Sequence, residues 1–198
     1  MIKIGFVYIK GGTGKTVLAS SAVLYLNAAA APAGLIDASP VPMAALLLAA
    51  GAQPGVYAGR EEVPVAVLRT PERLEEGYRA LERLKTAIAV VDFPPVSKTP
   101  RLDVAVAVAD PAGLHFLDGF RADASHVILA VNMADKIDVG RKDVANSVVA
   151  LPYSPGVAKA YQSLVPPILP HHPKARRLGV WKKAFLALME EITKWVRR

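Results

Sequence analysis

The sequence predicts an α/β fold: a doubly wound, mostly parallel sheet with helices on both faces. Three observations predict it. Apolar, β-branched runs alternate with helical patterns, most of these runs are apolar on both faces, and a glycine-rich loop joins the first run to the first helix. The 198 residues, 53% of them hydrophobic, are enough to bury a core, so we expect one domain over 1–198.

The strands are predicted from continuous apolar runs, because a strand covered by helices on both sides has no polar face. These runs lie at 2–9, 34–37, 63–68, 87–91, 104–109, 126–131 and 147–151.

The helices are predicted between these runs, at 15–29, 41–50, 71–85, 112–122, 155–164 and 180–197. The clearest start is at Thr70, which is placed to cap a helix that has Pro71 at its first position and acidic residues in its first turn. Proline and charge predict loops at 97–103 and 165–178.

Composition excludes several kinds of chemistry. The chain has no cysteine, so a disulfide, a thiolate nucleophile, an iron–sulfur cluster and a zinc–thiolate site are all excluded. The first residues do not form a signal peptide, and Asn27 and Pro32 interrupt the Ala-rich segment 17–36. We therefore expect a cytoplasmic protein without a membrane span.

Positive charge is concentrated near the end of the chain. Residues 151–198 carry nine basic and two acidic side chains, which accounts for the whole formal net charge of +7. A basic region of this kind attracts nucleic acid or an anionic membrane surface. Solubility alone explains it equally well.

One loop carries a phosphate-binding pattern. Residues 10–16 read "KGGTGKT" directly after the first strand run. Glycines allow positive φ and close backbone approach, so successive N–H groups can point at phosphate oxygens beside a helix N-terminus. Lys15 is expected to reach the β- and γ-phosphates, and the Thr16 hydroxyl to ligate Mg²⁺. The expected nucleotide-binding residues in this loop are Gly11, Gly12, Thr13, Gly14, Lys15, Thr16 and Val17.

Two carboxylates are placed to support the metal ion. Asp92 ends the apolar run "AIAVVD" and Asp37 ends "GLID", and the carboxyl ends of parallel strands border the ligand crevice of such folds. Mg²⁺ is commonly held by one or two carboxylates together with phosphate oxygens and water. The predicted metal ligands are therefore Thr16, Asp37 and Asp92.

The start of the loop departs from the usual G-x-x-x-x-G-K-[ST] pattern. Ile9 stands where the pattern has its first glycine, and an additional lysine, Lys10, follows it. With "GLIDASP" and "VVDFPP" further on, this lysine-first loop resembles the deviant-Walker P-loop ATPases of the ParA/MinD family. Two later stretches, "VILAVNMADK" and "LPYSPGVAKAY", resemble archaeal MinD-like members.

The resemblance implies a P-loop NTPase fold, ATP and Mg²⁺ as cofactors, and a homodimer that forms when ATP binds. It implies that Lys10 reaches across the two-fold interface to phosphate oxygens of the partner's ATP, which makes the nucleotide charge part of the dimer contact. It also places Asn132 against the adenine, although a strand-end cap is nearly as good an interpretation, and the loop around Pro152 over the base.

One position differs from the family pattern. Members read D-x-D-P after the second strand, and the second aspartate positions the attacking water, but here Ser39 takes that place after Asp37. A serine carries no charge to orient the water, so we expect slow hydrolysis. The expected catalytic residues are Lys10, Lys15, Asp37 and Ser39.

The segment 180–197 is predicted to form a basic amphipathic helix. Its apolar face comprises Trp181, Ala184, Phe185, Leu188, Ile192, Trp195 and Val196. Docking of this face on the sheet is the favoured interpretation. The resemblance keeps two alternatives open, a membrane-binding helix as in MinD and a DNA-binding basic end as in ParA.

Three functions follow from these patterns. The first is a dimerising ATPase switch that acts in DNA partitioning or intracellular positioning with an unidentified protein partner. The second is an ATP-gated binding module that hardly hydrolyses, which Ser39 favours. The third is an ATP-dependent small-molecule enzyme on the same fold, similar to dethiobiotin synthetase.

Overall fold

A computed structural model describes residues 1–134, 144–168 and 178–196 of the chain. Its strands are β1 (Ile2–Val7), β2 (Ala33–Asp37), β3 (Gly55–Ala58), β4 (Pro64–Val67), β5 (Ile88–Asp92), β6 (Leu102–Ala109), β7 (Ala124–Asn132) and β8 (Ser147–Leu151). They form one sheet in the order β3-β4-β2-β5-β1-β6-β7-β8. Neighbouring strands in it run parallel, except that β3 is antiparallel to β4 at one edge. The predicted mostly parallel α/β sheet is confirmed.

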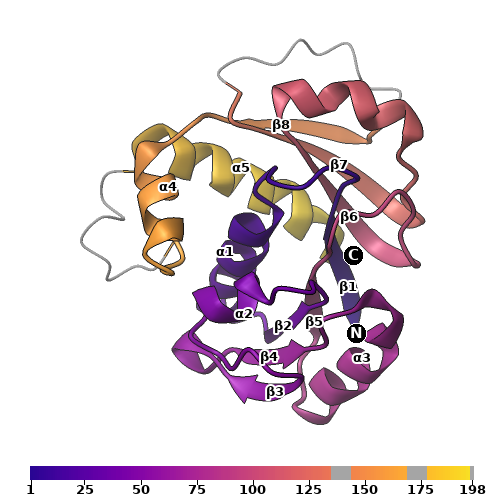
Figure 1. Cartoon of the computed structure of the whole chain (residues 1–198), viewed down its shortest axis with the longest axis vertical. Helices are drawn as coiled ribbons and strands as arrows, with labels where there is room; N and C mark the ends of the chain where they lie inside the picture. Colours follow the sequence, from indigo (N-terminus) through magenta and orange to yellow (C-terminus); the bar gives the residue numbers. More distant parts are fainter. Residues whose placement is uncertain (135–143, 169–177, 197–198) are drawn as a thin grey trace.

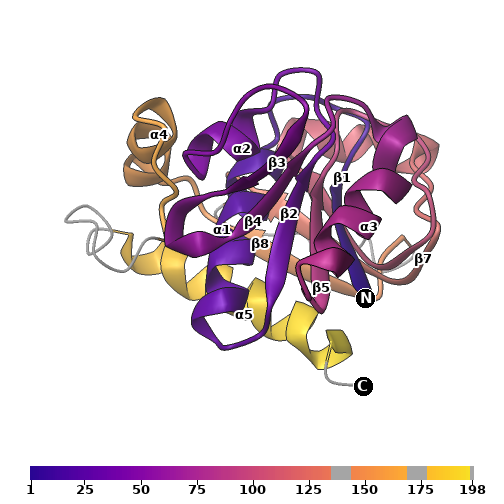
Figure 2. The same ribbon diagram turned by 90° about the horizontal axis from the view of Figure 1, so that it is seen from below.

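Helices cover both faces of this sheet (Figures 1 and 2). On one face, α1 (Lys15–Ala28), α2 (Met43–Leu47) and α5 (Gly179–Val196) contribute to a shared apolar core. On the other face lie α3 (Leu74–Arg83) and the 3₁₀ helix η3 (Pro111–Gly119). The remaining helices are α4 (Pro155–Gln162), η1 (Arg60–Glu62) and η2 (Pro71–Arg73).

The central helix α1 is buried on nearly all sides because small residues let its neighbours approach closely. Ala19, Ser20, Ser21 and Ala22 in its middle are all buried. This helix contacts β1, β2 and β5, so its first turn is fixed against the carboxyl ends of these strands.

Parallel pairing brings polar residues together at one edge of the sheet. In the register of β2 and β5, Asp37 is the partner of Asp92, and Asp92 also pairs with Phe6 of β1. Two aspartates that are far apart in the sequence thus lie side by side at the strand ends, close to where α1 begins.

Several predicted elements differ from the structure. The first strand ends at Val7 rather than 9, and the predicted helix 41–50 is helical only over Met43–Leu47. The segment predicted as the helix 112–122 is a 3₁₀ helix, Pro111–Gly119, whose first turn is held by the Asp110 side chain. Leu102 begins β6, although the loop was predicted to continue to 103.

The edge strand β3 was not predicted. It has four residues that are mostly exposed, so it lacks the continuous apolar run that marks the buried strands. Only the antiparallel pairing with β4 makes it a strand.

The apolar face of the C-terminal helix is docked, as the favoured interpretation expected. Trp181, Phe185, Leu188 and Ile192 are buried against the sheet, and the ring of Trp195 stacks on His126 with centroids 4.1 Å apart. The described helices include none that is long and apolar enough to cross a membrane. Part of the predicted basic region, 169–177 and 197–198, lies outside the described residues.

Candidate functional site

The glycine-rich loop runs from the end of β1 to the first residue of α1. Gly12 and Gly14 have φ angles of 74° and 96°, in the left-handed region that favours glycine. Gly14 is the N-cap of α1, so the loop passes directly into the helix N-terminus. Gly11 and Gly12 are exposed, whereas Thr13 is buried. The loop therefore presents backbone rather than side chains to a ligand.

The Lys15 side chain is held inside this loop. Its Nζ donates to the carbonyl oxygen of Lys10 at 3.1 Å, and the side chain is almost completely buried. Burial lowers the pKa of the Lys15 ammonium, and the negative charge of Asp92 opposes that shift. A buried cation with one carbonyl partner is suited to binding an anion.

Thr16 and Asp92 meet at the base of the loop. The Thr16 hydroxyl donates to Asp92 Oδ2 at 2.8 Å. The other carboxylate oxygen, Oδ1, is buried and has no hydrogen-bond partner among the described residues, and the same is true of Thr13 Oγ1. Burial, and secondly the negative charge of Asp37, raise the pKa of Asp92.

These oxygens fit a magnesium ion. An orphaned carboxylate oxygen beside a hydroxyl is the donor set of a hard cation, and a cation there would relieve the burial cost of the charge. The described residues contain no cluster of three or more acidic, histidine or cysteine side chains. The remaining ligands would therefore have to be phosphate oxygens and water, as is usual for Mg²⁺.

Asp37 is engaged with backbone groups. Its Oδ1 accepts from the amide of Ser39 and its Oδ2 from the amide of Ala45, both at 3.0 Å. Burial raises the pKa of Asp37, and these backbone hydrogen bonds oppose the shift. The carboxylate thus fixes the segment from Ser39 to the start of α2, and Ser39 itself is half-buried.

The additional lysine is paired within the same chain. Lys10 Nζ lies 2.7 Å from Asp110 Oδ2 and 3.0 Å from Oδ1. Asp110 follows β6 and also accepts from the Gly113 amide, where it caps η3. The Lys10 side chain is 36% exposed. The sequence analysis missed Asp110, although it ends an apolar run in the same way as Asp37 and Asp92.

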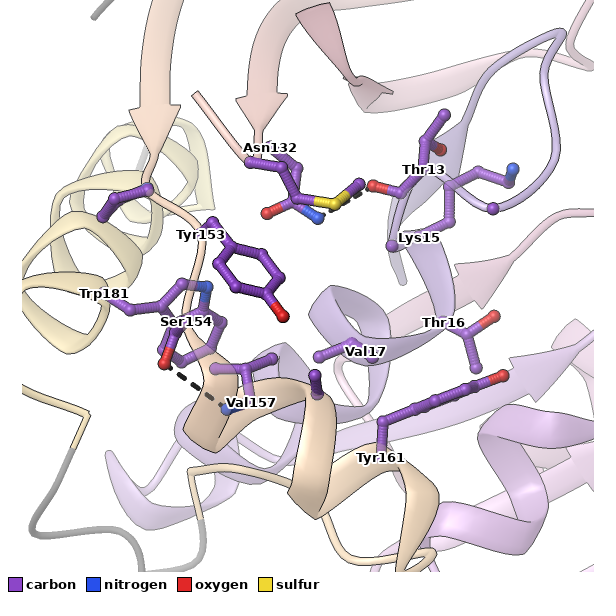
Figure 3. A pocket seen from close by; sticks show the side chains of 15 residues that line it. Thr13, Lys15, Thr16, Val17, Asn132, Tyr153, Ser154, Val157, Tyr161 and Trp181 are labelled. Atoms are coloured by element: carbon purple, nitrogen blue, oxygen red, sulfur yellow. Dashed lines mark hydrogen bonds between the residues drawn. The ribbon is translucent and has the colours of Figure 1, made fainter. Parts of the chain in front are cut away.

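A pocket of about 260 Å³ opens beside the loop (Figure 3). The loop and the first turn of α1 form one wall, including Thr16 and Val17. Asn132 at the end of β7 and Pro152 after β8 line it as well, so the structure brings both predicted base-side residues next to the phosphate loop.

Aromatic side chains form a second wall of the pocket. Tyr153, Tyr161 and Trp181 all line it, and Figure 3 shows Trp181 on the side farthest from Lys15, Tyr153 near the middle and Tyr161 close to Thr16. The Ser154 hydroxyl accepts from the Val157 amide and so caps α4, which carries Tyr161. The sequence analysis singled out only Pro152 here. The signal was present in "LPYSPGVAKAY", but Trp181 was assigned to a docked helix face alone.

No protein-family model matches the sequence, and no curated protein matches it. Among solved structures, the septum site-determining protein MinD of Pyrococcus horikoshii, complexed with Mg-ADP, is 17% identical with a TM-score of 0.68, over 98% of this chain and 97% of that one. The MinD cell division protein of Aquifex aeolicus is 13% identical with a TM-score of 0.72, over 98% and 97%. A ParA family ATPase of Chlorobium tepidum is 15% identical with a TM-score of 0.67, over 95% and 98%.

These similarities establish the fold. The chain has the ParA/MinD-like P-loop ATPase architecture, as the sequence analysis predicted from "KGGTGKT" and the two aspartate-ended runs. At such identities the comparison concerns the fold alone, so the function has to be argued from the site.

Proposed function

We propose that the protein is an ATP-binding switch of the ParA/MinD type, which dimerises when ATP is bound and hydrolyses it slowly. One observation carries the proposal. The glycine-rich loop holds the buried Lys15 close to the Thr16 hydroxyl and the unpartnered Oδ1 of Asp92, and the pocket beside this loop is lined by aromatic side chains. Each part corresponds to one part of Mg-ATP, namely phosphates, metal ion and base.

Within this site the residues have separate tasks. Lys15 and the loop amides bind the phosphates, while Thr16 and Asp92 hold Mg²⁺, with Asp37 beside them. When bound, Mg²⁺ neutralises charge on the β- and γ-phosphates. The base would lie between Asn132, Pro152 and the aromatic wall.

Lys10 supports the dimer part of the proposal. Its ammonium is partly exposed and holds one carboxylate of its own chain, so another anion can replace that partner, and the released Asp110 carboxylate keeps its hydrogen bond from the Gly113 amide. In a face-to-face dimer, that anion would be the phosphate of the partner's ATP. The ion pair between Lys10 and Asp110 would then be present in the monomer and broken in the dimer.

The geometry around Asp37 supports slow hydrolysis. Because both carboxylate oxygens accept backbone hydrogen bonds, Asp37 is not free to move into the position that Ser39 occupies. A second candidate, an ATP-gated module that hardly hydrolyses, is favoured by the same observation. Single-turnover hydrolysis separates the two candidates: a measurable rate in the ATP-bound dimer indicates the switch ATPase.

The substitution Asp92→Asn tests the site directly. The variant keeps an oxygen for the Thr16 hydroxyl but loses the charge that a metal ion needs, so ATP affinity is expected to lose its dependence on Mg²⁺. Calorimetric titration with ATP, with and without Mg²⁺, measures this. The matched control is Asp103→Asn, which changes an exposed carboxylate near the start of β6, whereas Asp92 ends β5. If the parent binds no ATP, or if Asp92→Asn retains the full Mg²⁺ effect, the assignment is wrong.

The same variant, which weakens the proposed metal site, should stabilise the fold when no ligand is bound. Because the pKa of Asp92 is raised in the fold, the folded protein retains a proton that the unfolded chain loses above about pH 4. The free energy of unfolding of the parent therefore falls as the pH rises from about 4 toward the raised pKa of Asp92 in the folded protein. Asp92→Asn should raise the melting temperature by about 3 °C or more near pH 8, and by less near pH 5.5.

We propose non-specific DNA as the surface on which the dimer acts. The apolar face of α5 is buried, so this helix exposes charge, including Lys182 and Lys183, rather than an insertable apolar face, and Lys159 of α4 is exposed as well. Deleting α5 would remove core residues such as Phe185, so it cannot test the role of this surface.

Salt dependence tests the DNA proposal. Affinity for duplex DNA should fall steeply with salt, and the combined variant Lys182→Ala/Lys183→Ala should lower the slope of log affinity against log salt by up to about 2. Binding isotherms at several salt concentrations measure this. Liposome binding that is insensitive to salt but lost in Leu186→Ser, which changes an exposed apolar residue of α5, would favour a membrane instead.

A further inference from the structure

Asn132 makes a contact that a base-binding role does not require. Its Nδ2 donates to the carbonyl oxygen of Thr13 at 2.9 Å, joining the end of β7 to a loop 119 residues earlier in the chain (Figure 3). A carbonyl oxygen only accepts, so the N–H side of the amide must face the loop and Oδ1 must face elsewhere.

The amide also occupies the space next to Gly14. A Cβ at Gly14 would lie 2.3 Å from Asn132 Nδ2, closer than any real contact. Gly14 has φ 96° and is the N-cap of α1. Asn132 and Gly14 are therefore matched in shape, and the loop conformation and the position of the asparagine depend on each other.

This contact sets the direction of a phosphate donor. In a trans peptide the C=O and N–H groups point in opposite directions, so fixing the Thr13 carbonyl toward β7 fixes the Gly14 N–H away from it. A carbonyl that accepts a hydrogen bond also makes the N–H of its own peptide a stronger donor. Gly14 lines the pocket, so in the proposed complex its N–H would be a donor to a phosphate oxygen.

We propose that Asn132 is a positioning residue of the phosphate site, which holds the Thr13–Gly14 peptide in its anion-binding orientation. The proposal rests on the proposed function, because it assumes that the loop binds polyphosphate. It differs from a base contact in the atom used and in the part of the ligand affected: Nδ2 acts through the loop on the phosphates.

The same segment connects the loop to the base side of the pocket. The residue after Asn132, Met133, has φ 60°, and the amide of Ala134 donates to the Leu151 carbonyl oxygen at 3.1 Å. Leu151 directly precedes Pro152 and Tyr153, which line the pocket. Asn132 thus lies on a short covalent and hydrogen-bonded path between the glycine-rich loop and the segment that carries Pro152 and Tyr153.

Comparing two ligands tests the proposal. Magnesium tripolyphosphate has the phosphates of ATP but no base, so only a loop-positioning role affects its binding. Calorimetry on the full chain should show that Asn132→Ala and the similarly sized Asn132→Leu weaken tripolyphosphate and ATP alike, by about 3- to 10-fold, as expected for one lost hydrogen bond. Thermal unfolding identifies which of the two variants is folded.

Two further variants calibrate the comparison. Tyr153→Ala changes the aromatic wall and should weaken ATP while weakening tripolyphosphate by less than about twofold. Asn146→Ala removes an amide whose Oδ1 accepts from the Val127 backbone, away from the pocket, and should change neither affinity. A shift of the Gly14 amide resonance in Asn132→Leu, absent in Asn146→Ala, is the spectroscopic sign of the altered peptide.

The outcomes distinguish failure of the loop-positioning role from failure of ATP binding itself. Weakening of tripolyphosphate in the Asn132 variants supports the proposal, and a still larger loss for ATP supports it and adds a base contact. Unchanged tripolyphosphate affinity with weakened ATP overturns it and leaves Asn132 as a base contact alone. If the parent protein binds neither ligand, the proposed function itself fails.

Discussion

Lys15→Ala should abolish measurable binding of Mg-ATP. The ammonium is buried in the loop with a single carbonyl partner, so its removal takes away the only buried cation that lines the described pocket. A charge-assisted hydrogen bond contributes about 1.5–3 kcal/mol, and Lys15 is placed to contact two phosphates, so affinity should fall at least about 100-fold. Equilibrium titration with a fluorescent ATP analogue measures the loss.

A matched lysine controls for charge. Lys85→Ala removes an exposed lysine between α3 and the start of β5, at the amino end of that strand and away from the loop. This variant should bind ATP as the parent does. Loss of binding must also occur without loss of the fold, which the melting temperature without ligand reports. A folded Lys15→Ala variant with parental ATP affinity would mean that the phosphate site is misplaced.

Ser39→Asp should accelerate hydrolysis. The position follows Asp37 at the carboxyl edge of the sheet, and its amide already bonds to Asp37 Oδ1. An aspartate there restores a negative group that can orient the attacking water, while the phosphate loop remains unchanged. We expect the single-turnover rate to rise about 10-fold, less than a fully adapted water-positioning group would give, because the surroundings fit serine.

Ser39→Asn separates charge from size. It has nearly the shape of aspartate without the charge, so it should leave the single-turnover rate near that of the parent. Equal acceleration by asparagine would show that size rather than charge matters at this position. No acceleration by aspartate, at normal ATP affinity, would show that Ser39 does not limit hydrolysis.

Most of the sheet could be predicted because its signals are local. Continuous apolar runs marked the parallel strands, and the strand-ending aspartates were expected at one edge, where the register makes Asp37 and Asp92 partners. The loop from Gly11 to Thr16 was also recognisable, since its glycine spacing reflects backbone angles that only glycine adopts readily.

The remaining features depend on contacts between distant residues. The Lys10–Asp110 ion pair spans 100 positions and the Asn132–Thr13 contact 119, so neither produces a local pattern. The strand β3 exists only through its pairing with β4. Gly113 and Gly119 weaken the helical preference of η3, whose first turn is set by the Asp110 cap.

Lys10 has a different partner in each proposed state of the protein. In the single chain it is bound to Asp110, and in the proposed dimer it binds the partner's ATP. Asp110→Asn should release it, and Lys10→Ala should remove it, so the two substitutions are expected to shift dimerisation in opposite directions.

Sedimentation of the parent, Lys10→Ala and Asp110→Asn over a range of Mg-ATP concentrations tests this most directly. We predict that the parent is monomeric without nucleotide and dimeric with ATP. Lys10→Ala should bind ATP but remain monomeric, and Asp110→Asn should form dimers at a lower ATP concentration than the parent. A parent that stays monomeric at saturating ATP, or a dimer that persists without nucleotide and in Lys10→Ala, would contradict the account.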